Sequence, residues 1–229
     1  MDLSKQYQSR IVTADEAVKK ILPGLRVFLT GNCSTPQTVL AALVKHARQM
    51  RDVEICQALT VGPADYVSPD MEGHIRVNTM FISANIRKAV QEGRADFTPV
   101  LLSEFPLLFK NKHLPIDVAL VHLSPPDEHG FLSFGIENGL TKSPAESAKT
   151  IIAEVNQQMP RTLGDSFIHI SRVNYIIPVD YPLAEMSMAG EGSDEITERI
   201  AGYIAELIRD GATMQMGIGA IPDAVLKFL

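Results

Sequence analysis

The chain has 229 residues, of which 45% are hydrophobic and 21% charged, and its formal net charge is −6. This composition is typical of a globular protein, and the length suits one large domain or one domain with part of another. The negative charge and the lack of a basic run argue against a nucleic-acid partner, because neutralising phosphates requires clustered Lys and Arg. No apolar run reaches the ~20 residues of a membrane span, so we expect no membrane partner.

The N-terminus shows no signal-peptide pattern, and the two cysteines, Cys33 and Cys56, suggest free thiols in a reducing compartment. We therefore expect a cytoplasmic protein. The six histidines have no metal-ligand spacing, so no metal site is expected.

Taken in chain order, the first predicted helix covers residues 12–22, where Thr13 is a good N-cap and Glu16 can complete a capping box. Short apolar segments then alternate with helical ones. Strands are expected at residues 26–30, 53–59, 75–81, 117–123, 150–155 and 175–179, and helices at 36–49, 83–92 and within 103–110. This alternation predicts an α/β fold in which helices flank a mostly parallel sheet.

The last part of the chain is expected to be a separate segment. Residues 180–195 predict a linker between a domain at 1–185 and a segment at 186–229. Within 186–229 we expect a helix over about 195–209 that Ser193 or Asp194 caps, a short buried strand at 213–217, and a glycine loop that leads into another helix. Pro222 suits the first turn of that helix, so the loop should present backbone N–H groups to an anion or an oxyanion.

The two glycine loops of the chain share a pattern. Gly31-x-Cys33-x-x-Pro36-x-x-Val39-Leu40 aligns with Gly217-x-Gly219-x-x-Pro222-x-x-Val225-Leu226, and each loop follows a helix, a turn and a short strand. Any strand–helix unit with such a turn could match by chance. The matching order of elements favours a duplicated α/β domain whose second copy has only begun within residues 203–229.

Two acidic stretches have both a chemical and a structural interpretation. His129, in Pro125-Pro126-Asp127-Glu128-His129-Gly130, could serve as an acid or base, but a rigid turn is favoured. Glu137 could be a nucleophile, but the Asn138-Gly139 pair after it is foremost a turn signal.

Other polar groups also have a structural interpretation. Asn85, Arg87 and Arg94 could contact a phosphate or carboxylate, but a solvated helix face is favoured. Cys33 has no neighbouring base in the sequence, so we expect it to pack as a small side chain instead of acting as a nucleophile. Gly217-x-Gly219 lacks the third glycine of a dinucleotide-binding fingerprint, which argues against a Rossmann site.

Three stretches can be compared with a known family. They are Pro125-Pro126-Asp127-Glu128-His129-Gly130, Ile152-Ala153-Glu154-Val155-Asn156-x-Gln158-Met159-Pro160-Arg161-Thr162 and Gln215-Met216-Gly217-Ile218-Gly219-Ala220-Ile221-Pro222-Asp223-Ala224-Val225. Together they resemble the acetyl-CoA hydrolase/transferase family (class I CoA-transferases), and within it most of all the 4-hydroxybutyrate CoA-transferase type. The resemblance covers essentially the whole chain. It implies two similar α/β domains with the active site between them. This chain would then be an N-terminal fragment that holds the first domain and the start of the second, with the rest of the C-terminal domain missing.

The resemblance also implies covalent, ping-pong catalysis. A glutamate of the family attacks an acyl-CoA thioester, the freed CoA thiolate then forms a glutamyl-CoA thioester, and a second carboxylic acid accepts the CoA. The partners would be an acyl-CoA such as acetyl-CoA and a short-chain carboxylic acid such as 4-hydroxybutyrate. Coenzyme A would be a substrate, with no permanently bound cofactor, and a homo-oligomer is expected.

Carried over to this chain, the CoA-binding segment would be Gly217, Ile218, Gly219, Ala220 and Ile221, and the loop facing the acyl or carboxylate group would be Gly31, Asn32, Cys33 and Ser34. The family's nucleophilic glutamate follows the first of these motifs by roughly a helix and a strand, a position that would lie beyond Leu229. We therefore expect this chain by itself to be inactive. Two alternatives stay open: an acyl-CoA hydrolase, in which water replaces the acceptor acid, and a non-catalytic nucleotide-binding α/β module.

Overall fold

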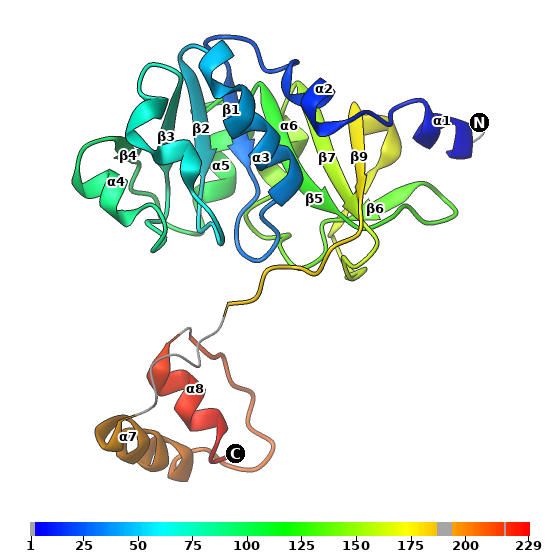
Figure 1. The fold of residues 1–229 in the computed structure, drawn as a ribbon. Coiled ribbons are helices and arrows are strands. Elements are labelled where there is room, and N and C mark those ends of the chain that lie inside the picture. Colours follow the sequence, from blue (N-terminus) through cyan, green and yellow to red (C-terminus); the bar gives the residue numbers. More distant parts are fainter. Residues whose placement is uncertain (1–2, 187–193, 218) are drawn as a thin grey trace. The chain divides into compact units, whose positions relative to one another are not determined.

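Two compact units, Met1–Ala184 and Glu185–Leu229, make up the computed structural model of the chain (Figure 1). The structure describes residues 3–186, 194–217 and 219–229. No helix in these ranges is both long enough and apolar enough to cross a membrane. That the second unit is the beginning of another domain stays a prediction.

A seven-stranded sheet forms the centre of the first unit. In spatial order its strands are β4 (Ala95–Phe97), β3 (Ile75–Thr79), β2 (Val53–Gln57), β1 (Arg26–Leu29), β5 (Val118–Leu123), β7 (Thr150–Asn156) and β9 (Tyr175–Val179). Every neighbouring pair is parallel, which confirms the predicted α/β fold with a mostly parallel sheet. Parallel strands are covered on both faces, and this is why the central strands β1, β5 and β7 consist mostly of apolar residues.

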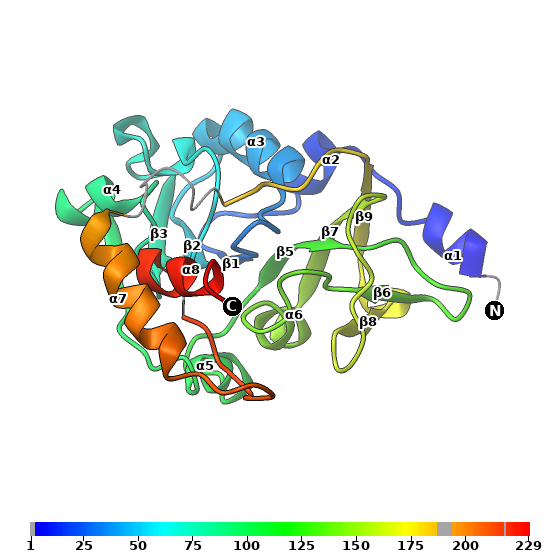
Figure 2. The ribbon, with the colours of Figure 1, turned by 90° about the horizontal axis from the view of Figure 1, so that it is seen from below.

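Helices cover both faces of the sheet (Figures 1 and 2). The helices are α2 (Ala14–Val18), α3 (Gln37–His46) and α4 (Arg87–Gln91) on one face, and α5 (Phe105–Lys110) and α6 (Lys142–Ser147) on the other. Val27 and Leu29 of β1 enter the core beneath α3, whereas Phe28 between them enters the core beneath α5. Successive side chains of a strand point to opposite faces, so β1 contributes to both cores.

Local signals account for the first helix. The Thr13 hydroxyl accepts the N–H of Glu16 at 3.2 Å, and the Glu16 carboxylate accepts the N–H of Thr13 at 2.9 Å. This arrangement is the predicted capping box, and it is confirmed.

Several short elements were not predicted from the sequence. They are α1 (Leu3–Gln8), β4, α6, β6 (Phe131–Ser133), β8 (Phe167–His169) and 3₁₀ turns at Asp65–Val67, Pro69–Met71 and Ile170–Arg172. The helix expected at 36–49 is α3 followed by a 3₁₀ turn at Ala47–Gln49. β6 and β8 pair antiparallel as a separate two-stranded ribbon. Each has three residues and its partner is distant in the sequence, so no local hairpin pattern marks them.

The second unit is a pair of helices, α7 (Glu195–Glu206) and α8 (Ala220–Leu226). Ala201 of α7 packs with Ala224 and Val225 of α8. Asp194 caps α7, because its side chain accepts the N–H of Thr197 at 2.6 Å. Asp194 is one of the two caps that the sequence predicts. The other, Ser193, lies outside the described residues.

The prediction of a buried strand at 213–217 is wrong. No strand is assigned there, and Met214 and Met216 are 41% and 37% exposed. A strand forms only beside another strand, and the described residues of this unit contain none.

Candidate functional site

The loop that follows β1 lies where the strand order of the sheet reverses. From β1 the chain continues through β2 and β3 to β4 on one side, then returns to β5 and continues through β7 to β9 on the other (Figure 1). The loops after β1 and β5 therefore diverge at the carboxyl edge of the sheet, where ligands bind in open parallel sheets. Residues 31–36, called the β1 loop below, contain the predicted residues Gly31, Asn32, Cys33 and Ser34.

A second loop, residues 58–62 after β2, supports the β1 loop from the side. The Asn32 N–H donates to the carbonyl of Leu59. A Cβ on Gly31 would overlap the carbonyl oxygen of Leu59, so glycine is required at this position by the close approach of the two backbones. This support was not predicted from the sequence, because the contact depends on the pairing of β1 with β2.

Most backbone N–H groups of the β1 loop already donate to the protein. The N–H of Ser34 donates to the Gly31 carbonyl, and that of Thr35 to the Asn32 carbonyl, each at 3.2 Å. Within the described part of the chain, the N–H of Cys33 has no such acceptor. Its thiol is free and half-buried. The Cys33 amide is therefore available to a ligand.

Glu137 reaches the β1 loop from the segment that follows β6. Its carboxylate accepts hydrogen bonds from the side-chain amide of Asn32 and, at 2.9 Å, from the N–H of Leu140. Burial raises the pKa of Glu137 above its usual range. The turn predicted at Asn138-Gly139 is confirmed, since Gly139 and Leu140 form a turn. Glu137 itself is 5% exposed and supports the β1 loop.

The amino end of α3 is occupied by the protein's own side chains. Pro36 at the N-cap makes no side-chain hydrogen bond. Instead Glu154 of β7 accepts the N–H of Val39 at 2.6 Å and the hydroxyl of Tyr181, whose oxygen accepts the N–H of Gln37 at 3.1 Å. This helix end is therefore not free to bind an anion.

Glu154 and Tyr181 were not predicted as site residues. The one local signal was a carboxylate inside the otherwise apolar strand predicted at 150–155. Burial raises the pKa of Glu154 to about 7, because lost solvation outweighs the hydrogen bonds that favour the carboxylate.

His122 of β5 lies beside this pair. It is the register neighbour of Glu154 across the β5–β7 ladder, and its ring centroid is 5.5 Å from that of Tyr181. Burial lowers the pKa of His122 to about 4, so its imidazole is neutral near pH 7.

The loop that carries the two prolines after β5 is a structural turn. The Asp127 carboxylate accepts the N–H groups of His129 and Phe131 at 2.9 and 2.8 Å, and Arg161 donates to its other oxygen at 2.6 Å. The side chains of His129 and Glu128 are 73% and 86% exposed. The rigid-turn interpretation is therefore confirmed.

The polar stretch around α4 is partly solvated and partly used within the protein. Arg87 is exposed on α4, as the helix-face interpretation predicts. The Asn85 side chain instead donates to the Gly62 carbonyl at 3.0 Å, and Arg94 is half-buried in an ion pair. Asn85 thus connects the segment before α4 to the loop after β2. This contact was not predicted from the sequence.

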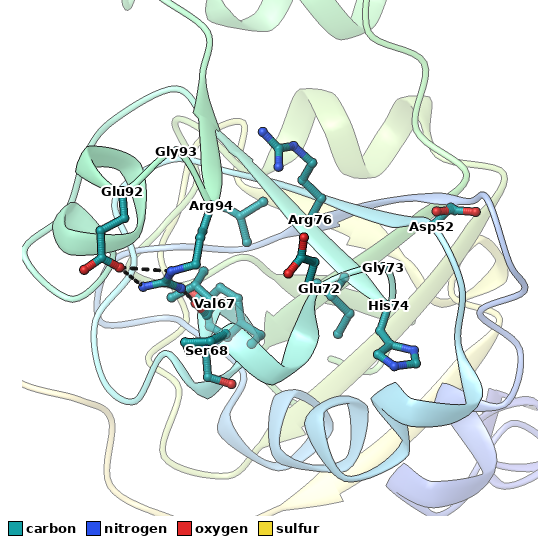
Figure 3. Close-up of a pocket in the computed structure, with 14 residues that line it drawn as sticks. Asp52, Val67, Ser68, Glu72, Gly73, His74, Arg76, Glu92, Gly93 and Arg94 are labelled. Atoms are coloured by element: carbon teal, nitrogen blue, oxygen red, sulfur yellow. Dashed lines mark hydrogen bonds and ion pairs between the residues drawn. The ribbon is translucent and has the colours of Figure 1, made fainter.

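A cavity of about 350 Å³ lies at the opposite edge of the sheet, where β2 and β3 begin (Figure 3). Its lining includes the acidic residues Asp52, Glu72 and Glu92, the basic residues Arg76 and Arg94, and the imidazole of His74. Arg94 pairs with Glu92 at 2.6 Å and Arg76 pairs with Asp96, so these cations already have anionic partners. The cavity is separated from the β1 loop by the length of the strands, and the carboxyl edge is the better candidate site. Among the described residues, no three His, Cys, Asp or Glu side chains gather as metal ligands.

The predicted CoA-binding segment lies in the second unit, at the start of α8. Gly219 is the N-cap with a φ of +147°, a conformation that side-chain-bearing residues rarely adopt. Ala220 and Ile221 begin the helix, and Gly217 precedes it in an exposed position. Ile218 lies outside the described residues. The role of this segment in CoA binding stays a prediction.

The chain is similar to known CoA-transferases over its whole length. Residues 1–184 match the acetyl-CoA hydrolase/transferase N-terminal domain. The chain is 46% identical over 229 residues to the 4-hydroxybutyrate coenzyme A transferase of Clostridium kluyveri, covering 100% of this chain and 53% of that protein. It is 42% identical over 218 residues to the succinyl-CoA:acetate/propanoyl-CoA:succinate CoA transferase of Fasciola hepatica, covering 94% of this chain and 45% of that protein.

Among solved structures, the crystal structure of 4-hydroxybutyrate CoA-transferase from Porphyromonas gingivalis matches with a TM-score of 0.82 at 34% identity. The match covers 98% of this chain and 52% of that one. The chain thus spans about half the length of these relatives. The predicted family resemblance is confirmed, and the chain belongs to the acetyl-CoA hydrolase/transferase family, whose N-terminal domain its first 184 residues match.

Proposed function

We propose that this chain is the amino-terminal part of a CoA-transferase that moves CoA between an acyl-CoA, such as acetyl-CoA, and a short-chain carboxylic acid, such as 4-hydroxybutyrate. The supporting observation is the β1 loop at the reversal of strand order, in a chain 46% identical over its whole length to a 4-hydroxybutyrate coenzyme A transferase. Coenzyme A is a substrate, and no permanently bound cofactor takes part.

The reaction proceeds through the carboxylate of an enzyme glutamate. The carboxylate attacks the thioester carbonyl of the acyl-CoA, so an acyl–glutamyl anhydride forms and CoA leaves as the thiolate. The thiolate attacks the glutamyl carbonyl, which releases the first acid as its carboxylate and leaves a glutamyl-CoA thioester. The acceptor carboxylate then attacks this thioester, and the same two steps in reverse give the new acyl-CoA and the free glutamate.

The part played by this chain is to bind the substrates and stabilise the oxyanions. Each tetrahedral intermediate carries an oxyanion, which a fixed backbone N–H stabilises best in a site without water. We assign the Cys33 N–H to the oxygen of the acyl or carboxylate group, because the N–H groups on either side of it, those of Asn32 and Ser34, already donate to the protein. The segment of Gly217, Ile218, Gly219, Ala220 and Ile221 is assigned to CoA.

The nucleophile is assigned to a position that follows the 217–222 motif, where these 229 residues hold no glutamate. Glu137 and Glu154 do not replace it, because both are buried and hydrogen-bonded to the first unit. The chain by itself is therefore proposed to be inactive. The whole CoA-transferase of which this chain is proposed to be a part is called the natural protein below, and we expect it to be a homo-oligomer.

A transfer assay tests the reaction. The natural protein should form 4-hydroxybutyryl-CoA from acetyl-CoA and 4-hydroxybutyrate without accumulating free CoA. Chromatography of the reaction mixture over time measures both products. Release of free CoA at the same rate with and without the acid would identify a hydrolase instead. Product formation by the 229-residue chain alone would overturn the assignment of the nucleophile.

Ligand-dependent melting separates an enzyme half from a nucleotide-binding module. A ligand that binds the folded state raises its melting temperature. The natural protein should be stabilised by CoA, with NAD and ATP as the comparison nucleotides. Stabilisation by NAD or ATP but not by CoA would contradict the proposed function.

A further inference from the structure

Glu154 and Tyr181, called the α3 clamp below, hold the first turn of a helix without being used in the reaction above. The first N–H groups of an α-helix have no acceptor within the helix. In α3 the N–H of Gln37 donates to Tyr181 at 3.1 Å and the N–H of Val39 to Glu154 at 2.6 Å. The Tyr181 hydroxyl donates to Glu154, so the two acceptors form one unit.

The α3 clamp fixes the β1 loop because the loop runs directly into this turn. At its start the loop is fixed by the N–H of Thr30, which donates to the Leu120 carbonyl at 3.1 Å. Near its end the Thr35 hydroxyl accepts the N–H of Val61 at 3.3 Å. Pro36 then enters α3 without a capping side chain of its own. At this end the loop is therefore held by the contact of Thr35 with Val61 and, through the first turn of α3, by Glu154 and Tyr181.

Tyr181 is itself held by the strand that carries Glu154. The Asn156 side-chain amide donates to the Tyr181 carbonyl at 2.9 Å, and the Asn156 side-chain oxygen accepts the N–H of Tyr181 at 3.4 Å. Glu154 and Asn156 are two residues apart on β7 and so share one face of the sheet. Both the backbone and the side chain of Tyr181 are thus positioned by β7.

The α3 clamp also decides which donors a substrate can use. Glu154 is fully buried and takes up the positive end of α3, where a carboxylate is favoured. The N–H groups of Gln37 and Val39 are occupied, so an acyl oxygen has to accept its hydrogen bond from a residue that precedes the helix. The Cys33 N–H is the candidate donor there.

We propose that Glu154 and Tyr181 are positioning residues for CoA transfer, because by holding the first turn of α3 they keep the β1 loop and its Cys33 N–H where the acyl oxygen binds. Neither side chain touches the substrate, and this role rests on the proposed function. A misplacement of ~1 Å can cost on the order of 10²-fold in rate. The loss should appear in kcat, since the segment assigned to CoA lies in the second unit.

Two conservative variants of the natural protein test the role in catalysis. Tyr181→Phe removes the hydroxyl that links Gln37 to Glu154, and Glu154→Gln keeps the shape but removes the charge. We expect kcat to fall by roughly 10- to 100-fold in each, with KM for the acyl-CoA within about twofold of the unchanged protein. Wild-type kcat in both variants of an active protein would overturn the role.

Matched controls keep the comparison specific. Tyr175→Phe changes a half-buried tyrosine of β9 whose ring lies near Lys20. Glu54→Gln changes a glutamate of β2 that pairs with Arg26 at 2.5 Å. Both residues lie outside the clamp, so both controls should keep the kcat of the unchanged protein. An equal loss of kcat in controls and clamp variants would also overturn the role.

Amide hydrogen exchange tests the clamp itself in the 229-residue chain, whether or not CoA transfer is found. Tyr181→Phe and Glu154→Gln should each speed exchange at Gln37 and Val39 by roughly tenfold or more, the equivalent of about 1.4 kcal/mol of lost local protection, while amides of β5 exchange as before. Unchanged exchange at both positions would overturn the clamp. Faster exchange in a natural protein that transfers no CoA would keep the clamp and reject the proposed function.

Discussion

Asn32 and Glu137 lie 105 residues apart in the sequence, yet the side-chain amide of Asn32 donates a hydrogen bond to the carboxylate of Glu137. The contact joins the β1 loop to the segment between β6 and α6, which comes after β5 in the chain. Asn32 has a positive φ of +50°, which asparagine tolerates better than most residues. The pair thus fixes the side chain of the residue next to Cys33.

Replacing Glu137 should weaken the folded state. In Glu137→Gln an amide NH₂ has to face either the Asn32 amide or the Leu140 N–H, so one buried donor loses its acceptor. We expect the free energy of unfolding to fall by about 1–3 kcal/mol, measured by urea denaturation. Glu128→Gln, at a side chain that is 86% exposed, is the matched control and should leave it unchanged. Equal effects of the two substitutions would contradict a supporting role for Glu137.

The close approach of two backbones at Gly31 gives a second prediction. In Gly31→Ala the new methyl group would overlap the Leu59 carbonyl oxygen, so the two loops must separate, and we expect a loss of about 1–3 kcal/mol in the free energy of unfolding. Gly139→Ala is the control, because a methyl group there meets no atom within 4 Å. Its stability should stay close to that of the unchanged chain. Thermal unfolding of both variants checks this, and a stable Gly31→Ala chain would disprove the steric account.

Glu154 and His122 should give the stability two opposing pH dependences. The pKa of Glu154 rises from 4.5 to about 7 on folding, so the folded state binds more protons in that window and stability falls as the pH rises through it. The pKa of His122 falls from 6.5 to about 4, so stability rises with pH between these values. Tyr181, the other ionisable group in contact, stays neutral because burial raises its pKa.

Single substitutions should separate the two contributions. Glu154→Gln removes the decrease in stability that Glu154 causes as the pH rises. The free energy of unfolding should therefore rise more steeply between pH 4 and 6.5 than in the unchanged chain. His122→Asn removes the increase in stability that His122 causes as the pH rises. The free energy of unfolding should then fall as the pH increases from 4.5 to 7. Urea denaturation across this pH range measures both slopes. Identical slopes in all three chains would show that neither group has the shifted pKa.

The turn after β5 allows a test of structure against chemistry. Asp127→Ala removes the acceptor of two backbone N–H groups and of Arg161, and we expect it to lower the free energy of unfolding by about 1–3 kcal/mol. His129→Ala removes an exposed side chain and should change neither stability nor CoA transfer by the natural protein. A strong loss of transfer in His129→Ala, with unchanged stability, would restore His129 as a candidate acid or base.

The parts of the fold that were predicted correctly have local signals. The Thr13–Glu16 capping box depends on residues three apart, and the strands of the sheet other than β4 are short segments rich in apolar residues. β6 and β8 were missed because three residues are too few for a strand to be recognised without its distant partner. The strand expected at 213–217 was wrong for the related reason that a strand exists only when paired.

For this protein the sequence by itself determined the α/β class and, through its motifs, the family, because turn chemistry and motifs are read from neighbouring residues. The tertiary structure decided that Glu137 holds Asn32 and that Glu154 and Tyr181 hold the start of α3. Those contacts join segments 105 to 144 residues apart. The burial that raises the pKa of Glu154 exists only once the sheet and α3 have packed together.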